Sequence, residues 1–375
     1  SDSELYFDGE ITECISGGHA INAQGAGSFY VWIGPNANIH HNVVAYGTIY
    51  AQCEGGTIDI YGKINDNIST DRGGGLTMAN NFSPTIVNMY EGAEICNNVS
   101  TQTGGGVMVS CGTFTMYGGT ISGNISGAGN VGAADKTGGG VYVRRGGTFI
   151  MNGGEITNNS AVGVGGGIAY QAEDYHNLAP RVELNGGIIS GNKMNAAVSG
   201  DAANGYTIAE EGESNDLAVI GGTFYSKVDR YPSVGSDVVL GDQNIYMQDY
   251  DFTIVDLPRG TKLGNAAAGC ETATTAALEE AKLTTVVGSF WYQTDAASLT
   301  LTMTEPGNST YSSEKPLYAA VVATNEGGTP LSENTYTALL PVTVEDGRFS
   351  LNLPTVNRSG YAVVLLQETP DAPAN

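Results

Sequence analysis

Residues 171–180 hold the densest set of side chains in this chain that could do chemistry. Their sequence, QAEDYHNLAP, places Glu173, Asp174, Tyr175 and His176 next to one another. Three cations lie directly after this segment or in the preceding sequence repeat: Arg181, Arg144 and Arg145. Carboxylates, an imidazole, an aromatic ring and a cation could together bind a sugar or transfer protons. We therefore expect a ligand-binding site at these seven residues, assign no catalytic residue, and keep a solvated loop as the alternative.

Two further polar groups could bind a metal ion. His40 and His41 are adjacent, but the sequence places no third ligand beside them, and such a pair most often faces water. The other group is Asp59, Asp66, Asp71 and Arg72. It matches no recognised calcium loop. We expect no cofactor, with a calcium ion at the second group as the alternative.

These residues are distributed along a unit that returns six or more times. From Gly104 to Asn124, and again from Gly138 to Asn159, glycines open a short strand, a second strand follows, and an isoleucine precedes an asparagine by three residues. The closing pairs are Ile39/Asn42, Ile64/Asn67, Ile95/Asn98, Ile121/Asn124, Ile156/Asn159 and Ile189/Asn192, with a fainter copy at Ile11/Cys14. The steps between successive isoleucines are 25, 31, 26, 35 and 33 residues, a period typical of a solenoid.

Within each unit the apolar residues alternate, which predicts strands of three to five residues. A strand this short cannot bury a face alone. A coil of three such strands can, if the next coil stacks on it about 4.8 Å further along. The inward residues then form columns. One column is Ile39, Ile64, Ile95, Ile121, Ile156 and Ile189, and another is Ile49, Leu76, Val107, Val141 and Ile168.

The bends between these strands explain the polar part of the repeat. The chain has 54 glycines in 375 residues because many bend positions need a positive φ or leave no room for a Cβ atom. The asparagine that closes each unit suits a left-handed bend and can hydrogen-bond to its stacked neighbour. The Gly-Gly-Gly-Val runs are not phosphate loops, since no Lys-Ser/Thr follows them. The repeated glycines and asparagines are therefore structural residues.

The units resemble right-handed parallel β-helices of the pectin-lyase-like type over about residues 1–245. The wording GGTF-x-M-x-GG-x-I-x-x-N, seen at 146–159, is similar to repeats in surface proteins of gut bacteria and, more loosely, in bacterial polymorphic outer-membrane proteins. The resemblance implies the fold but not one function, because this scaffold carries lyases, hydrolases, adhesins and phage tailspikes. The Asn-Thr-Asp, Asp-Asp, Gly-His-Gly and Arg-Ile-Lys patterns of pectinolytic hydrolases are absent. For a lyase, Arg144 and Arg145 are the only candidate bases.

A second domain follows the repeats. From about residue 246 the glycine triplets vanish, a helical patch spans 274–283, and alternating strands separated by turn signals continue to the end. We predict an all-β chain: a right-handed parallel β-helix over 1–245, with three short strands per coil, and a small β-rich domain over 246–375, a sandwich with one short helix.

Charge and composition limit the partners and the location. Fifteen basic and 39 acidic residues give a net charge of −24, which disfavours nucleic acid, anionic membrane surfaces and polyuronates that no cation bridges. No run of 18 apolar residues is present, so we expect no membrane insertion of this region. The acidic, lysine-poor composition and the family resemblance imply an extracellular or cell-surface protein.

The five cysteines show no CxxC spacing. The register of the repeats places Cys53 and Cys111 two coils apart, about 9 to 10 Å, which is too far for a disulfide. We expect all five thiols to be free.

These observations favour a non-enzymatic, adhesin-like surface module that binds glycans or a host or bacterial surface protein. The first alternative is a β-helix polysaccharide lyase or glycoside hydrolase, and the second is a structural spacer. A groove with two carboxylates about 5 to 10 Å apart would favour a glycosidase, whereas a flat aromatic strip would favour binding.

Overall fold

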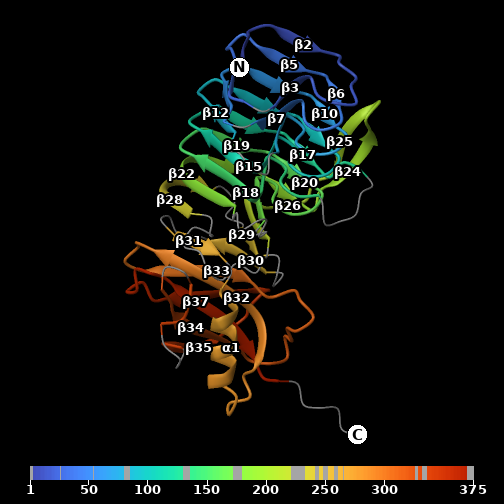
Figure 1. Ribbon diagram of the computed structural model, residues 1–375. Helices are drawn as coiled ribbons and strands as arrows, with labels where there is room; N and C mark the ends of the chain where they lie inside the picture. Colours follow the sequence, from blue (N-terminus) through green and yellow to red (C-terminus); the bar gives the residue numbers. More distant parts are fainter. Residues whose placement is uncertain are drawn as a thin grey trace. The chain divides into compact units, whose positions relative to one another are not determined.

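The computed structural model describes residues 3–25, 27–53, 55–79, 85–129, 136–171, 180–220, 233–240, 245–247, 252–256, 261–264, 266–325, 328–331 and 336–369. The chain is all-β and contains a parallel β-helix and a β-rich C-terminal unit (Figure 1). It divides into two compact units, residues 1–222 with 235–244 and residues 223–234 with 245–375. Within the described residues, no helix is long and apolar enough to cross a membrane.

The β-helix stacks its strands in parallel columns, which we call columns A to D in chain order. Column A contains β3 (Ile21–Gly25), β7 (Ile49–Cys53), β11 (Leu76–Met78), the starts of β15 (Val107–Met116) and β18 (Val141–Met151), β21 (Ile168–Gln171) and β27 (Leu217–Ile220). Column B contains β1 (Ser3–Phe7), β4 (Phe29–Ile33), β8 (Thr57–Ile60), β12 (Ile86–Met89), the ends of β15 and β18, and the start of β22 (Arg181–Ser190).

Column C follows the next bend of each coil. It contains β2 (Glu10–Thr12), β5 (Asn38–His40), β9 (Lys63–Asn65), β13 (Glu94–Cys96), β16 (Thr120–Ser122), β19 (Glu155–Thr157) and the end of β22. Column D adds a two-residue strand after the closing asparagine of each coil. Its members are β6 (Val43–Val44), β10 (Ile68–Ser69), β14 (Val99–Ser100), β17 (Ile125–Ser126), β20 (Ser160–Ala161), β23 (Lys193–Met194) and the antiparallel β26 (Glu213–Ser214).

Three strands lie outside this simple stacking. β24 (Ala197–Asp201) and β25 (Gly205–Glu210) form an antiparallel hairpin, and β28 (Ser233–Leu240) pairs with β22. β15 and β18 are also longer than the three to five residues expected from the sequence. A register irregularity follows Val109 of β15 and its partner Val143 of β18. It replaces the bend between columns A and B, so that two short strands join into one in each coil.

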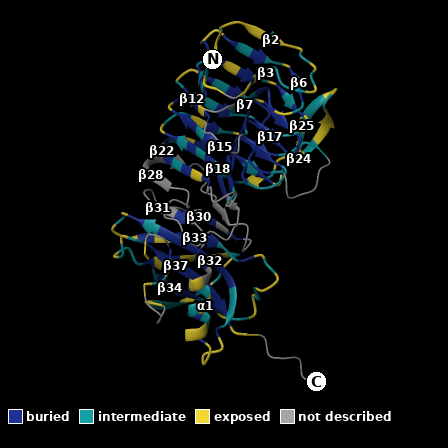
Figure 2. Cartoon of the chain, viewed as in Figure 1, coloured by how far each residue is buried: buried dark blue, intermediate teal, exposed yellow. Residues whose placement is uncertain are grey.

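The predicted hydrophobic columns are confirmed. Ile95 pairs with Ile64 on one side and with Ile121 on the other, and Ile121 pairs in turn with Ile156. Every isoleucine of that column and every member of the column from Ile49 to Ile168 has no exposed surface. Figure 2 shows this buried interior running through the stacked strands. Burial of each such side chain stabilises the fold by about 1.5 to 3 kcal/mol, so the columns supply the main stabilisation of the rod.

The closing asparagines form a buried ladder. Each side-chain amide donates to the Oδ1 atom of the asparagine in the next coil, at 2.9 to 3.1 Å, and to an isoleucine carbonyl of the preceding coil. The ladder runs through Asn42, Asn67, Asn98, Asn124, Asn159 and Asn192 and ends on Asp216, whose Oδ1 accepts from Asn192 at 2.8 Å. The expected bond to the stacked neighbour is therefore present.

The expected left-handed conformation lies one residue earlier than predicted. The residue before the ladder asparagine has a positive φ in each coil: Glu13, which precedes Cys14 in the faint first copy, and then His41, Asp66, Asn97, Gly123, Asn158 and Gly191. The ladder asparagine itself is occupied with hydrogen bonds into the core, so the adjacent residue makes the turn. The glycine triplets pack beside this ladder: a Cβ on Gly106 would lie 2.7 Å from the Gly140 carbonyl and 3.0 Å from the Asn124 amide.

The C-terminal unit has two antiparallel sheets and one helix. The first sheet contains β29 (Ile245–Met247), β30 (Phe252–Asp256), β33 (Leu299–Thr304) and β36 (Arg348–Leu353). The second has the order β31 (Thr261–Gly264), β32 (Thr285–Thr294), β37 (Tyr361–Gln367), β34 (Leu317–Ala323) and β35 (Ala338–Val342). Phe252 of the first sheet meets Phe290 of the second with ring centroids 6.1 Å apart, so the sheets pack face to face as a sandwich.

The helix of this unit starts earlier than predicted. α1 spans Ala268–Ala277, and only 274–277 of the predicted 274–283 are helical. The chain after Leu278 turns instead, and Leu278 and Leu283 both pack with Cys270 and the alanine-rich outer face of β34 and β37. Burial of these two leucines against the sheet replaces the helical continuation that their spacing suggested.

Candidate functional site

The structure locates part of the site predicted from the sequence. Glu173, Asp174, Tyr175 and His176 lie outside the described residues, so that part of the prediction is not tested. Arg144 and Arg145 lie where column A of β18 ends, and Arg181 begins the column B part of β22. Arg144 pairs in register with Gln171, the last described residue before that segment. The arginines therefore lie on the two coils expected from the sequence.

The three arginines have different surroundings. Arg144 is only 7% exposed, and its guanidinium lies 5.7 Å from the centre of the Tyr142 ring. The backbone of Arg145 is left-handed, with φ 55°. Arg181 pairs with Glu183, two residues along the same face of the strand. A buried Arg144 beside an aromatic ring has the features of a structural cation.

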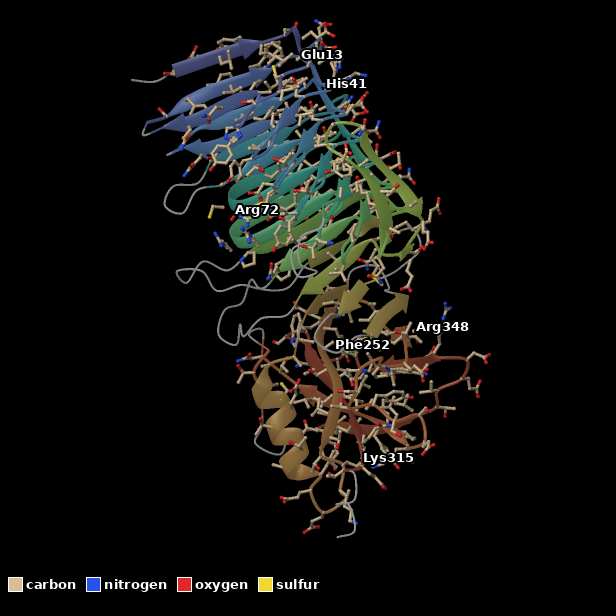
Figure 3. The ribbon with its side chains drawn as sticks, turned by 90° about the vertical axis from the view of Figure 1, so that its right-hand side faces the viewer. Glu13, His41, Arg72, Phe252, Lys315 and Arg348 are labelled. Carbon is tan, nitrogen blue, oxygen red and sulfur yellow. The ribbon has the colours of Figure 1, made fainter. Side chains whose placement is uncertain are left out.

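The predicted calcium group is not formed by the described residues. Asp59 lies on strand β8 and accepts hydrogen bonds from neighbouring side chains, whereas Asp66 occupies a bend after column C. Asp71 pairs with Arg72 at 3.2 Å. Across the described residues, no group of three His, Cys, Asp or Glu side chains could hold a metal ion. His40 contacts His41 and also Glu10, at 2.6 and 2.8 Å, on the exposed side of the first coils (His41 is labelled in Figure 3).

The surface of the β-helix carries an aromatic strip that the sequence analysis did not identify. We define it by six residues: Tyr6, Tyr30, Trp32, Tyr61, Tyr90 and Tyr117. Five successive coils contribute one ring each to a ladder, and Tyr30 lies beside its first member. All six rings are half-buried or exposed. The strip therefore runs along the rod on the outer side of column B and of the bend that follows it.

The rings of the strip are not equally open to a ligand. Tyr61 and Tyr90 stack with centroids 4.4 Å apart and 3° between their planes, so the faces that meet are shielded. Tyr117 stacks on Tyr90 at 5.5 Å but is 52% exposed. Tyr6 and Trp32 are tilted by 48° at 6.3 Å, and Tyr6 is 62% exposed. The two ends of the ladder therefore offer ring faces, and its centre offers hydroxyl edges.

Asp59 organises the polar centre of the strip. Its carboxylate accepts hydrogen bonds from the Tyr30 hydroxyl at 2.8 Å, from the Asn88 amide at 2.8 Å and from the Tyr90 hydroxyl at 3.4 Å. The register explains this convergence, because Asp59 and Asn88 are stacked partners on β8 and β12. Asp59 thereby fixes the orientation of two rings and presents a carboxylate edge between them.

Three tyrosines of the strip, Tyr6, Tyr30 and Tyr90, have a raised pKa. Burial and then the charge of Asp59 raise the pKa of Tyr90 to about 12. Burial, with the hydrogen bond to Asp59 next, raises the pKa of Tyr30 well above its usual value. The charge of Glu4 is the main cause of the raised pKa of Tyr6. At neutral pH these hydroxyls therefore remain hydrogen-bond donors.

Local sequence places each ring. Tyr61, Tyr90 and Tyr117 each follow directly after a buried residue, Ile60, Met89 and Met116 respectively, which are stacked partners in column B. The next residue therefore emerges at the same point of each coil, about 4.8 Å from its neighbour. On the coil before Tyr61, Gly34 stands at this position. A Cβ there would lie 2.4 Å from the Trp32 ring, so glycine leaves room for the indole to extend the ladder. The in-register recurrence of tyrosine was the sequence signal that could have revealed the strip.

The arrangement has the chemistry of a sugar-binding surface. Aromatic faces pack against apolar faces of sugar rings, and hydroxyl, amide and carboxylate groups bind sugar hydroxyls. The strip combines both kinds of group over several coils, and each coil advances by about the length of one sugar ring.

Comparison with known proteins adds no assignment to this geometry. The chain matches no protein-family model, no curated protein and no solved structure.

Proposed function

We propose that this protein is a non-enzymatic, secreted or cell-surface module that binds an extended glycan along the aromatic strip. One observation carries the proposal: five aromatic rings from successive coils form a continuous ladder whose two ends, Tyr6 and Tyr117, are more than half exposed. A ladder that served only to stabilise the rod would need stacked ring faces but no exposed ends. Exposed aromatic groups beside ordered polar groups are typical of binding surfaces.

Two sequence properties support the same proposal. The resemblance of the repeats to those of bacterial surface proteins favours an adhesin-like role outside the cell. The net charge of −24 disfavours polyanionic ligands, so the glycan is neutral or cationic. Residues 173–176, with Arg144, Arg145 and Arg181, remain a second candidate contact region.

The proposal is tested by screening the protein on a glycan array and measuring the affinity of each hit by calorimetry. Tyr6→Ala and Trp32→Ala should each weaken binding about 5- to 150-fold, as expected for the loss of about 1 to 3 kcal/mol of stacking free energy. Tyr336→Ala is the matched control, because Tyr336 is 37% exposed but belongs to the C-terminal unit. Tyr90→Ala tests the stabilising role of the ladder separately from its role in binding, since loss of a central stacked ring should lower the melting temperature.

Equal affinity of Tyr6→Ala, Trp32→Ala and Tyr336→Ala for a bound glycan would refute the assignment of the strip. Absence of any array binding would refute glycan binding and leave a protein partner or a structural spacer.

A glycoside hydrolase is the second candidate, and one observation favours it. Glu94 and Glu155 stack in column C two coils apart, with Thr120 between them, which places their backbones about 9 to 10 Å apart. That spacing is near the carboxylate separation of inverting glycosidases, about 6.5 to 9.5 Å. Release of reducing ends from a bound glycan, abolished in Glu155→Gln, would establish catalysis. For a lyase, unsaturated ends released from polygalacturonate with calcium, and lost in Arg145→Ala, would be required.

A further inference from the structure

A groove continues from the end of the aromatic strip. It has a cavity volume of about 430 Å³ and is lined by Glu91–Glu94, Gly119, Thr120, Gly154, Glu155, Gly187 and Ile188. These residues form the bends between columns B and C on four successive coils. Tyr117 directly precedes the Gly118-Gly119 bend, so the exposed end of the ladder adjoins the groove.

The floor of the groove is bare backbone. Gly119 and Gly154 have φ values of +83° and +85°, and a Cβ on either would lie 2.5 Å from a carbonyl oxygen of the preceding coil. Side chains are therefore excluded from the floor by both conformation and stacking. On the first of these four coils, the bend between columns B and C has one residue more than the same bend on the next coil. Glu91 and Gly92, in this longer bend, form the end wall of the groove.

The two long sides of the groove differ in chemistry. On the side of the ladder, Tyr117 is followed by Asn152 and Asn185, the latter donating to Asn152 Oδ1 at 3.0 Å. The other side is formed by Thr120, Glu155 and Ile188, which are stacked partners. Hydroxyl and carboxylate groups therefore line the groove itself, and Tyr117, Asn152 and Asn185 border it, each two residues before a glycine of the floor.

The carboxylates of the groove are not neutralised equally. Glu94 pairs with the Lys63 ammonium at 2.8 Å and accepts a hydrogen bond from Asn65 at 3.2 Å. Among the residues that the structure describes, no ion pair is found for Glu91 or Glu155. Both side chains are exposed. The groove therefore keeps uncompensated negative charge at its end wall and along one side.

We infer that the groove is the specificity-determining part of the glycan site and selects sugar units that carry a protonated amine. The inference rests on the proposed function, since the strip supplies the general affinity and the groove receives the same chain beyond Tyr117. The bare floor admits an extended chain, and Tyr117 stacks on one ring. Glu91, on the coil before Tyr117, pairs with an ammonium group on a preceding unit, and Glu155, on the coil after Tyr117, pairs with one on a following unit. An amino-sugar polymer satisfies all three conditions. A polyuronate does not, because its carboxylates are repelled by the negative charges of Glu91 and Glu155.

The test uses oligomers of β-1,4-linked glucosamine with free amines and the fully N-acetylated oligomers of the same length. Calorimetry is carried out at slightly acidic pH, which keeps the amines of the oligomer protonated. The wild-type protein should bind the amine form about fivefold more tightly, as expected for two exposed ion pairs. The preference should decrease as salt is added, because exposed charges are screened beyond about 10 Å at 0.1 M.

Variants distinguish the contribution of the groove to binding from the contribution of the strip. Glu91→Gln with Glu155→Gln should bring the two affinities together while leaving the affinity for the acetylated oligomer within about twofold of wild type. Glu279→Gln with Glu280→Gln is the matched control, since both residues are exposed and lie in the C-terminal unit. It should keep the preference. Trp32→Ala should weaken the binding of both oligomers by the same factor.

Equal wild-type affinity for the two forms, or a preference that survives the double groove variant, would overturn the amine assignment and leave the proposed function standing. Binding of neither form, together with binding of other glycans that depends on Trp32, would also overturn only the amine assignment. Absence of binding to any glycan would overturn the proposed function itself.

Discussion

Replacement of Asn124 by alanine tests whether the buried asparagine ladder holds successive coils in register. The Asn124 side chain makes four hydrogen bonds. Its Oδ1 atom accepts from the Asn98 backbone amide at 2.9 Å and from the Asn98 side chain at 3.1 Å. Its amide donates to the Ile95 carbonyl at 2.8 Å and to Asn159 Oδ1 at 2.9 Å. Alanine removes all four in a position with no solvent exposure.

The expected loss follows from these contacts. A hydrogen bond contributes about 0.5 to 1.5 kcal/mol net, so four of them correspond to about 2 to 6 kcal/mol. The buried Asn98 amide loses its acceptor, which places the effect in the upper half of that range. The matched control is Asn152→Ala, because Asn152 is exposed and makes its side-chain bond to Asn185 on the outer surface. That variant should change stability by less than about 0.5 kcal/mol.

The assay is urea unfolding followed by far-ultraviolet circular dichroism, with thermal melts as a second measure. Asn124→Ala should shift the urea midpoint strongly downward, and Asn152→Ala should not. Overlapping curves for the two variants would refute the reasoning, because the ladder would then contribute nothing beyond an exposed asparagine.

Three further predictions concern the β-helix. Ile121→Asp buries an unpaired charge at a position with no exposed surface and should lower the free energy of unfolding by several kcal/mol, about 3 to 5; a melt equal to wild type would contradict the column assignment. Glu13 has φ 58°, so Glu13→Asn should raise stability by about 0.5 to 1 kcal/mol in urea titrations, and an unchanged midpoint would show no strain there. The pKa of Tyr90 is raised from 10.0 to about 12, so its stabilising contribution is complete below pH 10 and is lost as the pH rises through about 12. The melting temperature of the wild-type protein should fall between about pH 10 and 12, and it should fall less in Tyr90→Phe. Identical pH profiles of the melting temperature for the two proteins would show that ionisation of Tyr90 does not cause the loss.

The regular part of the fold could be predicted because each coil repeats the same physical requirement. An inward isoleucine at a fixed place in every unit leaves one register in which the core is buried, and Ile95, Ile121 and Ile156 adopt it. The irregular parts depend on contacts between segments distant in sequence. The helix α1 ends at Ala277 because Leu278 and Leu283 pack against strands that lie later in the chain, which local helix propensity does not reveal.

The candidate site was harder to predict for a related reason. Residues 173–176 are chemically diverse and adjacent in one segment, so the sequence predicts a site there. The aromatic strip instead gathers single residues about 30 positions apart, such as Tyr61 and Tyr90, which stacking brings to 4.4 Å. Aligning the outward positions of the repeat as carefully as the inward ones would have shown them. The tilt of Trp32 over Gly34 has no such signal, because it depends on side-chain packing alone.

The most direct test of glycan binding by the strip uses the fluorescence of Trp32. The chain has two tryptophans, and Trp291 is buried in the C-terminal unit, where it donates to Thr324 at 2.8 Å. In Trp291→Phe, emission reports Trp32 alone. Titration with a glycan selected on the array should give a saturable change in Trp32 emission, and the dissociation constant should equal the calorimetric value for the same variant. A calorimetric binding curve with unchanged Trp32 emission and unchanged acrylamide quenching would contradict the account, because the glycan would then bind elsewhere.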